Sequence, residues 1–220
     1  MSTLVTGATR GIGLALVQAM AARGDAVTGT FRTTPGDVPG AAWLPYDATA
    51  PCAAADLARR HGTAPLDLLV CNAGVYPGRG DRLDTGFPPQ DWADAFAVNV
   101  TGVFLTVQAL LPALGRGTRP RIAIIASAMG SDARAPGGSY IYRASKAAAL
   151  NLGRNLATDL KPRGIAIGIY HPGWGRTDMG GTGAEIDAAT SARGLIARFD
   201  ALDLADTGCF RGHDGAAIPF

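Results

Sequence analysis

Residues 3–13 read TLVTGATRGIG, in which a short apolar run leads directly into a glycine-rich turn. Apolar side chains then recur at the spacing of one helix face, at Ile12, Ala15, Leu16, Ala19 and Met20. A strand that enters a glycine turn and then a helix brings backbone N–H groups, at the positive end of the helix, close to a bound phosphate. The segment therefore predicts a strand–turn–helix unit that binds a phosphate-bearing ligand.

The spacing of the glycines is Gly-x-x-x-Gly-x-Gly, which differs from the commoner dinucleotide pattern Gly-x-Gly-x-x-Gly. Its place directly after the first strand still favours a dinucleotide-binding turn over a turn that serves only packing. The residues expected to contact the dinucleotide here are Gly7, Thr9, Arg10, Gly11, Ile12 and Gly13.

Short β-rich runs and longer helical stretches alternate along the whole chain. The expected strands are 3–6, 26–31, 42–44, 66–71, 121–126, 165–170 and 208–211, and the expected helices are 11–23, 52–61, 91–111, 140–161 and 191–199. This alternation predicts an α/β fold of the Rossmann type, a doubly wound, seven-stranded parallel sheet with helices on both faces. Since no repeat or linker interrupts the pattern, residues 1–220 are expected to form a single domain.

Glycine and proline mark the expected helix ends. Gly24 and Gly62 suit the C-terminal stops of the first two helices, and Gly164 suits that of the long fourth helix. Pro51 suits the first turn of the second helix, with Thr49 as its N-cap.

The composition suits one well-buried core, since 47% of the 220 residues are hydrophobic and 17% are charged. The formal net charge of +2 is too small to recruit nucleic acid or a membrane, so neither partner is expected. Arg116, Arg119 and Arg121 lie close together, but no aromatic residue accompanies them and a solvated loop is expected.

The sequence contains neither a membrane-spanning pattern nor a metal-binding one. Polar residues interrupt the most apolar long stretch, 97–114, so we do not expect it to cross a membrane. Cys52, Cys71 and Cys209 are widely spaced, as are the three histidines, which favours neither a disulfide framework nor a metal site. Because the chain also opens without a charged and apolar leader, we expect a cytoplasmic location.

Lysine and glutamate are scarce, which limits the possible chemistry. Lys146 and Lys161 are the only lysines among 20 basic residues, and a single glutamate excludes a two-glutamate mechanism. Lys146 follows Tyr142 by one helical turn, so both side chains lie on one face. A nearby ammonium favours phenolate and is expected to lower the pKa of Tyr142 from about 10. Such a tyrosine can give a proton to a carbonyl oxygen or take one from an alcohol.

Further polar residues lie where the predicted strands end, at the edge where such sheets bind ligands. Ser127 follows the fifth strand, where it can hydrogen-bond a reacting oxygen, and Asn99 interrupts an apolar helical stretch. The other candidates at strand ends are Asn72, Ala73, Gly74, Pro172, Gly173 and Thr177.

The end of the second strand bears on the choice of dinucleotide. An acidic residue there would suit the free ribose 2′-hydroxyl of NAD(H), but this strand ends in Thr30, Phe31 and Arg32. Arg32 and Arg10 can instead hold a 2′-phosphate in bidentate fashion, which favours NADP(H) over NAD(H). The alternative is that both arginines are solvated surface residues.

Jointly these motifs resemble the short-chain dehydrogenase/reductase family. They occur in family order, as the glycine turn, Asp47, Asn72-Ala73-Gly74, Asn99, Ser127, Tyr142-x-x-x-Lys146, Pro172-Gly173 and Thr177. The sequences of residues 137–146, 171–181 and 213–220 are most similar to those of the branch that contains the bacterial C-factor signalling protein and the sniffer-type carbonyl reductases.

The resemblance implies a role for each matched residue. Tyr142 would be the general acid/base, and Lys146 would lower its pKa and bind the nicotinamide ribose. Ser127 would orient the substrate carbonyl, and Asn99 would hold a water in the proton relay. Asp47 would meet the adenine, Asn72-Ala73-Gly74 would shape the adenosine side, Pro172 and Gly173 would also contact the cofactor, and Thr177 would bind the carboxamide.

The predicted function is an NADP(H)-dependent oxidoreductase that interconverts a ketone, aldehyde or quinone and an alcohol. The family resemblance also implies a homodimer or homotetramer. The alternative is a dinucleotide-binding signalling or regulatory protein of C-factor type with little turnover. An epimerase or dehydratase of the extended type is weaker, because 220 residues leave no room for the added substrate domain.

Overall fold

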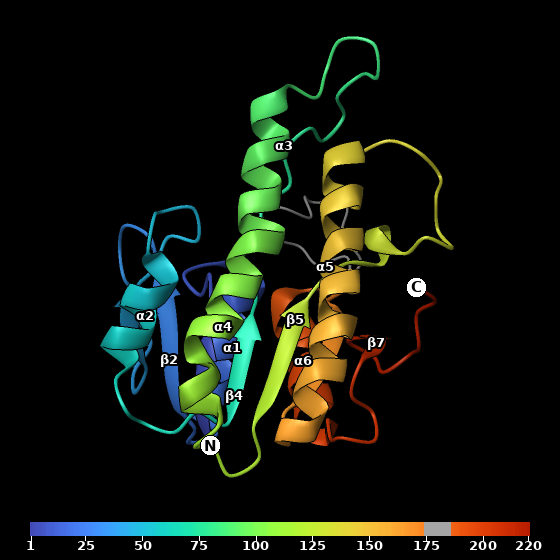
Figure 1. The fold of residues 1–220 in the computed structure, drawn as a ribbon. Helices are drawn as coiled ribbons and strands as arrows, with labels where there is room; N and C mark the ends of the chain where they lie inside the picture. The colour runs from blue at the N-terminus through green and yellow to red at the C-terminus, as the bar shows by residue number, and fades with distance from the viewer. Residues whose placement is uncertain (174–185) are drawn as a thin grey trace.

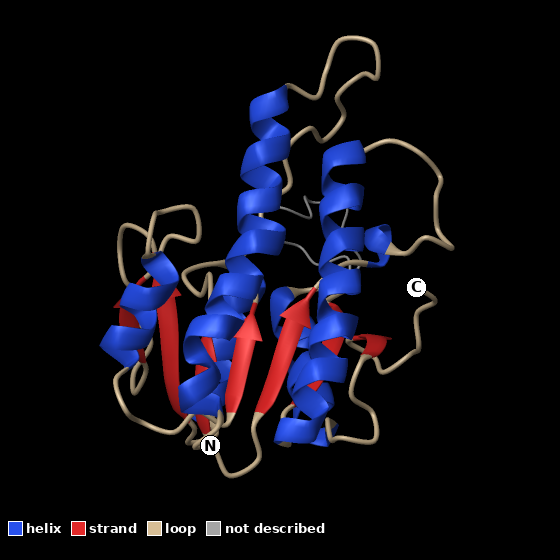
Figure 2. Cartoon of the chain, in the orientation of Figure 1, coloured by secondary structure: helices blue, strands red, loops and turns tan. Residues whose placement is uncertain are grey.

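The computed structural model describes residues 1–173 and 186–220, which contain a seven-stranded parallel sheet (Figures 1 and 2). The strand order is β3-β2-β1-β4-β5-β6-β7. The strands are β1 (Ser2–Val5), β2 (Ala26–Phe31), β3 (Ala42–Pro45), β4 (Leu68–Cys71), β5 (Arg121–Ile125), β6 (Ala166–His171) and β7 (Cys209–Gly212). The predicted Rossmann-type α/β fold is therefore confirmed.

Helices cover both faces of this sheet. Helices α1 and α6 pack on one face, and α2, α4 and α5 pack on the other. The helices are α1 (Gly11–Ala22), α2 (Ala53–His61), α3 (Pro89–Phe96), α4 (Gly102–Leu114), α5 (Tyr140–Leu160) and α6 (Ala188–Ala201). Short turns of other helical types are η1 (Ala97–Thr101, π), η2 (Ala128–Gly130, 3-10) and η3 (Lys161–Arg163, 3-10).

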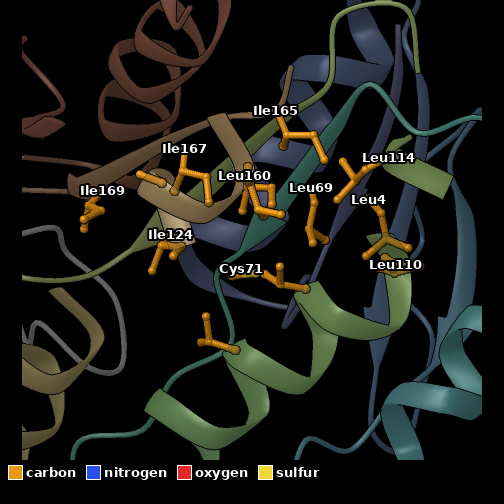
Figure 3. Packing of buried hydrophobic residues seen from close by; sticks show 14 of the residues in the cluster. Leu4, Leu69, Cys71, Leu110, Leu114, Ile124, Leu160, Ile165, Ile167 and Ile169 are labelled. Atoms are coloured by element: carbon orange, nitrogen blue, oxygen red, sulfur yellow. The ribbon is translucent and has the colours of Figure 1, made fainter. Parts of the chain in front are cut away.

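Two hydrophobic clusters hold these layers together, because successive residues of a strand point to opposite faces. Leu4, Leu69 and Ile124 face α4 and α5, where they pack with residues such as Leu110 and Leu114 (Figure 3). The alternate strand residues, Val5, Val70, Ala123 and Tyr170, pack with α1 and α6. Strands buried on both faces explain the nearly continuous apolar runs in the sequence.

The strand order reverses between β1 and β4, so the connections after these two strands diverge and leave a crevice at their carboxyl ends. The glycine turn follows β1 and Asn72 follows β4. The sheet topology thus brings together two segments that lie more than 60 residues apart in the sequence.

Two local predictions were wrong. Helix α2 begins at Ala53, behind Cys52 at φ 61°, so Pro51 lies outside the helix and Thr49 is not its N-cap. The Thr49 hydroxyl donates instead to Asp47 at 2.8 Å, because the chain is still turning at the end of β3. The predicted helix 91–111 is a longer run that begins at Pro89 and contains the π turn η1.

The expected solvated loop holds for two members of the basic cluster but not for the third, because Arg116 and Arg119 are exposed in the turn before β5 whereas Arg121 is the buried first residue of β5. Arg121 is 4% exposed and donates to the carbonyl oxygen of Phe199 at 2.7 Å. Arg119 donates to the carbonyl oxygens of Asp200 and Leu202, so both guanidinium groups satisfy the C-terminal carbonyls of α6. Arg116 joins the loop after α2 by a bond to the carbonyl oxygen of Thr63 at 2.9 Å.

The continuous helix Pro89–Leu114 is long and apolar enough to span a membrane by length and composition alone, with a mean hydropathy of 1.7. Its inner face is buried against the sheet, through residues such as Val103, Val107 and Leu110. A core helix of a soluble protein has the same composition for this reason.

Candidate active site

The glycine turn leaves no room for side chains at two of its glycines. Gly7 has φ +64°, and a Cβ atom there would lie 2.8 Å from the Cα atom of Ala73. A Cβ atom at Gly13 would overlap the carbonyl oxygen of Gly7 and lie 2.5 Å from Nδ2 of Asn72. The turn is therefore compact, and its backbone lies open at the N-terminus of α1.

Hydrogen bonds with two neighbouring segments hold this turn. Asn72 donates through its side-chain amide to the carbonyl oxygens of Thr6 and Gly7, at 3.0 Å each. The hydroxyl of Thr6 accepts from the backbone N–H groups of Asn72 and Ala73. The N–H of Gly7 donates to the hydroxyl of Thr30 in β2 at 3.0 Å. Asn72 thus braces the turn, a role that its place in the sequence did not reveal.

A cavity of about 410 Å³ runs from this turn to the inner end of the site. Most of the predicted cofactor-binding residues line it, namely Gly7, Thr9, Arg10, Gly11, Ile12, Gly13, Arg32, Asp47, Asn72, Ala73, Gly74, Tyr142, Lys146 and Pro172. Gly173 directly follows this lining at φ +84°, where a Cβ atom would meet Ile186 and His213. Thr177 lies outside the described residues.

One end of the cavity carries exposed basic side chains and one acidic group. Arg10 and Arg32 are both exposed and line the same end, beside Asp47. Hydrogen bonds from the N–H and hydroxyl of Thr49 lower the pKa of Asp47, and the charge of Arg32 adds to this effect. This end can therefore receive an anionic group together with a hydrogen-bonding ring.

The other end is built around the π turn η1. Asn99, 1% exposed, accepts from the N–H of Val75 at 2.9 Å and donates to the carbonyl oxygen of Val75. Its amide also donates to the hydroxyl of Ser145 at 2.9 Å, and Ser145 donates to the carbonyl oxygen of Tyr142. Asn99 therefore joins the segment after β4 to the first turns of α5. The wider π turn explains how a polar residue fits in an apolar helix.

Three reactive side chains meet at this end. Tyr142 and Lys146 are 7% and 5% exposed, and the Lys146 Nζ atom lies 5.7 Å from the centre of the Tyr142 ring. Lys146 donates to the carbonyl oxygen of Ile125 at 3.0 Å. Ser127 lies close enough to Tyr142 to lower its pKa, and its hydroxyl oxygen accepts from the N–H of Met129 at 3.1 Å. The structure thus places Ser127, which follows β5, beside Tyr142 and Lys146 of α5, as the sequence analysis had predicted.

The pKa of Tyr142 is not lowered as the sequence had predicted. Burial raises it to about 12, against the opposing effect of the Ser127 hydrogen bond. Burial also lowers the pKa of Lys146, to about 8. The prediction relied on stabilisation of the Tyr142 phenolate by the Lys146 ammonium. Burial outweighs this effect, because the loss of water destabilises the phenolate and the ammonium alike. At neutral pH the tyrosine is thus a neutral phenol, which can donate a proton.

The cavity fits a dinucleotide on the evidence of its own atoms. The turn would be filled by any Cβ atom at Gly7 or Gly13, and arginines lie at one end while a buried phenol and amine lie at the other. Backbone N–H groups at the N-terminus of α1 suit a pyrophosphate between these ends. No group of three or more potential metal ligands occurs within residues 1–173 and 186–220.

Comparison with known proteins identifies the class. A profile of the short chain dehydrogenase family matches residues 2–186, and the chain belongs to this family of oxidoreductases. It is 38% identical to C-signal of Myxococcus xanthus over 162 residues, which cover 72% of this chain and 95% of that protein. It is also 33% identical to 3-oxoacyl-[acyl-carrier-protein] reductase FabG of Escherichia coli, over 80% of this chain and 74% of that protein.

Solved structures with the same fold include two carbonyl reductases. The NADPH-bound carbonyl reductase from chicken fatty liver superposes with a TM-score of 0.90 at 29% identity, over 100% of this chain and 98% of that chain. The carbonyl reductase Sniffer of D. melanogaster superposes with a TM-score of 0.91 at 27% identity, over 100% of this chain and 99% of that chain. The predicted resemblance to the C-factor and sniffer branch is confirmed by these similarities.

Proposed function

We propose that this protein is an NADP(H)-dependent reductase that interconverts a carbonyl compound and an alcohol. The observation that carries the proposal is a neutral, buried Tyr142 beside Ser127 at the inner end of a cavity that begins at a glycine turn. When bound, the nicotinamide supplies hydride for reduction and accepts it in oxidation.

In this proposal the protein's own residues handle the proton and the substrate oxygen. Ser127 hydrogen-bonds the substrate carbonyl and holds it against the Tyr142 hydroxyl, which donates its proton to that oxygen. Lys146 binds ribose hydroxyls, and its ammonium form stabilises the phenolate that remains. Asn99 holds a water that passes a proton from solvent back to the Tyr142 phenolate.

The test of this mechanism is Tyr142→Phe, which removes only the hydroxyl. We expect the variant to bind NADPH with unchanged affinity by calorimetry and to lose carbonyl reduction by a factor of about 10²–10⁴. Ser127→Ala is expected to behave in the same way. Wild-type turnover in Tyr142→Phe would refute the proposed role of the phenol.

The proposed preference for NADP(H) rests on the exposed end of the cavity. Arg10 and Arg32 line it, no acidic residue ends β2, and arginine binds phosphate oxygens in bidentate fashion. Two similar solved structures are described as bound to NADPH and NADP. In this proposal Asp47, which lines the same end of the cavity, accepts a hydrogen bond from the adenine. We expect Arg32→Ala to reduce the ratio of kcat/KM for NADPH to that for NADH by about tenfold, the effect of about 1.4 kcal/mol. A wild type that prefers NADH would contradict this assignment.

The proposed substrate class is a ketone, aldehyde or quinone, as the similarity to two carbonyl reductases suggests. A panel of these carbonyls, followed by NADPH absorbance, tests it directly. The second candidate is a dinucleotide-binding signalling protein, favoured by 38% identity to C-signal. Tight NADPH binding without turnover of any carbonyl in the panel would favour that second candidate.

The assembly and location of the protein are part of the same proposal. We propose a cytoplasmic homodimer or homotetramer without nucleic acid or membrane partners. Phe104 and Leu105 of α4 are 39% and 40% exposed, which supports burial against another copy. Light scattering coupled to gel filtration measures the assembly, and a monomer at micromolar concentration would contradict it.

A further inference from the structure

Tyr76 lies in the loop that follows β4 and covers the reactive tyrosine. Its ring is stacked on the ring of Tyr142, with 4.0 Å between ring centres and 16° between ring planes. The contact joins a loop residue to a helix residue 66 positions later, so it exists only in the folded chain. Tyr142 retains only 7% of its exposure although it lies next to the cavity.

A hydrogen bond fixes the far end of the Tyr76 ring. Its hydroxyl and the Ser139 hydroxyl lie 2.7 Å apart, and it also donates to the Met129 sulfur at 3.9 Å. Ser139 immediately precedes α5, the helix that carries Tyr142. The Tyr76 ring is thus held against the Tyr142 ring at its face and attached to the start of the same helix at its hydroxyl.

Backbone strain is concentrated at the two sides of this contact. Ser139 adopts a left-handed conformation at φ 48°, and Phe87, at the other end of the loop, adopts φ 64°. Phe87 packs edge-on against Tyr140, with 5.3 Å between ring centres. Residues other than glycine keep such conformations only where surrounding contacts hold them, and they concentrate at functional sites. The loop and the start of α5 therefore hold each other in a defined arrangement.

A phenol that donates a proton must keep its hydroxyl in one direction. Rotation about the Cα–Cβ bond of Tyr142 moves its hydroxyl oxygen, and rotation of the ring about its own axis turns the plane in which the hydroxyl proton lies. The stacked Tyr76 ring restricts both rotations of the Tyr142 side chain. Misplacement of a reacting group by about 1 Å can cost about 100-fold in rate.

We propose that Tyr76 is a positioning residue, which holds the Tyr142 ring by stacking and is itself held by its hydrogen bond to Ser139. This role rests on the proposed function of Tyr142 as the proton donor. The Ser139 hydroxyl and the strained backbone at its position thus serve the reaction through Tyr76.

The variants that test this role separate the stack from its attachment. Tyr76→Leu removes the stack and should lower kcat by about 10- to 100-fold with little change in either KM. Tyr76→Phe keeps the stack and should recover most of that loss. Ser139→Ala should match Tyr76→Phe, and the double variant should be no worse than either, because both remove one hydrogen bond. Leu83→Ala is the matched control, an apolar residue of the same loop that is 74% exposed, and should leave kcat unchanged.

A spectroscopic measurement tests the same contact without activity. With 3-fluorotyrosine incorporated in place of Tyr142, a held ring should give two ¹⁹F resonances, one for each position of the fluorine. Tyr76→Leu should merge them into one averaged line. Two unchanged resonances in that variant, or a raised KM for the carbonyl with unchanged kcat, would overturn the proposal. If the wild type reduces no carbonyl, the proposed function fails, whereas the ¹⁹F spectrum still decides the role of Tyr76.

Discussion

The two ends of the cavity are built in contrasting ways. The glycine turn is made of backbone and small residues, and it is held by hydrogen bonds from Asn72, Thr6 and Thr30. The inner end is made of large side chains that burial has deprived of water, so the pKa of Tyr142 is raised to about 12 and that of Lys146 is lowered to about 8. Binding at the turn therefore depends on shape, whereas chemistry at the inner end depends on solvation and orientation.

The strongest test of this contrast is Lys146→Arg, which retains a charge at the inner end but changes its shape. We expect carbonyl reduction to fall by about 100-fold or more, because a planar guanidinium cannot replace a compact, fully buried ammonium that bonds the Ile125 carbonyl oxygen. The measurement is kcat/KM with NADPH, beside the affinity for NADPH. Lys161→Arg is the matched control at the exposed end of α5 and should retain full activity. Equal activity of both variants would remove Lys146 from the chemistry.

The next test uses pH to measure the burial of the inner end. The pKa of Lys146 is about 8 in the folded chain and 10.5 when solvated, so the unfolded chain binds more protons between these values. The contribution of Lys146 to the free energy of unfolding should therefore rise as the pH increases from about 8 to 10.5, by an amount on the order of a few kcal/mol. Urea unfolding of the wild type and of Lys146→Met across this range measures the difference. A difference between the two that does not change with pH would show that Lys146 is solvated.

At higher pH, Tyr142 should change the free energy of unfolding in the opposite direction. Its pKa is about 12 when folded and 10.0 when solvated, so the folded chain retains the proton longer and stability falls as pH rises between these values. The comparison of wild type with Tyr142→Phe isolates this loss, which should be absent from the variant. An increase in stability over the same range would contradict the burial of the phenol.

At the turn, Gly13→Ala tests shape alone. The added Cβ atom would overlap the Gly7 carbonyl oxygen and the Asn72 side chain, and we expect a loss of about 1–3 kcal/mol in stability together with weaker NADPH binding. Gly115→Ala is the control, because Gly115 has helical backbone angles and its nearest neighbour would lie at 3.4 Å. Thermal unfolding and calorimetry measure both effects. Wild-type affinity in Gly13→Ala would mean that the turn is looser than its contacts indicate.

The smallest effect is expected from Asn72→Ala, which leaves the turn in place but removes its brace. Two carbonyl oxygens, of Thr6 and Gly7, lose their side-chain donor, at a cost of about 1–2 kcal/mol. The pH dependence of activity should remain unchanged, since the inner end is untouched. A shifted pH profile would show that the two ends are coupled rather than separate.

The sequence predicted the features that depend on local patterns and missed those that depend on distant contacts. Glycine spacing, strand–helix alternation and the Tyr142-to-Lys146 interval are local patterns, and they predicted the sheet, the turn and the reactive pair. The bond from Asn99 to Ser145 and the buried Arg121 were missed, because each depends on a partner at least 40 residues away. The π turn at Asn99 was also missed, where Asn99 bonds Val75, 24 residues earlier in the chain. The exposed-loop interpretation of Arg121 was wrong for the same reason.

The sequence by itself determined which groups this protein can bring to a reaction, since backbone periodicity places a tyrosine and a lysine one turn apart wherever that helix lies. Only the tertiary structure decided the pKa values of these two groups, and with them their protonation states. Burial opposes charge on both groups, which reverses the predicted direction of the Tyr142 pKa. The stacking of Tyr76 on Tyr142 is likewise a property of the folded chain, because desolvation and ring contacts arise only when distant segments meet.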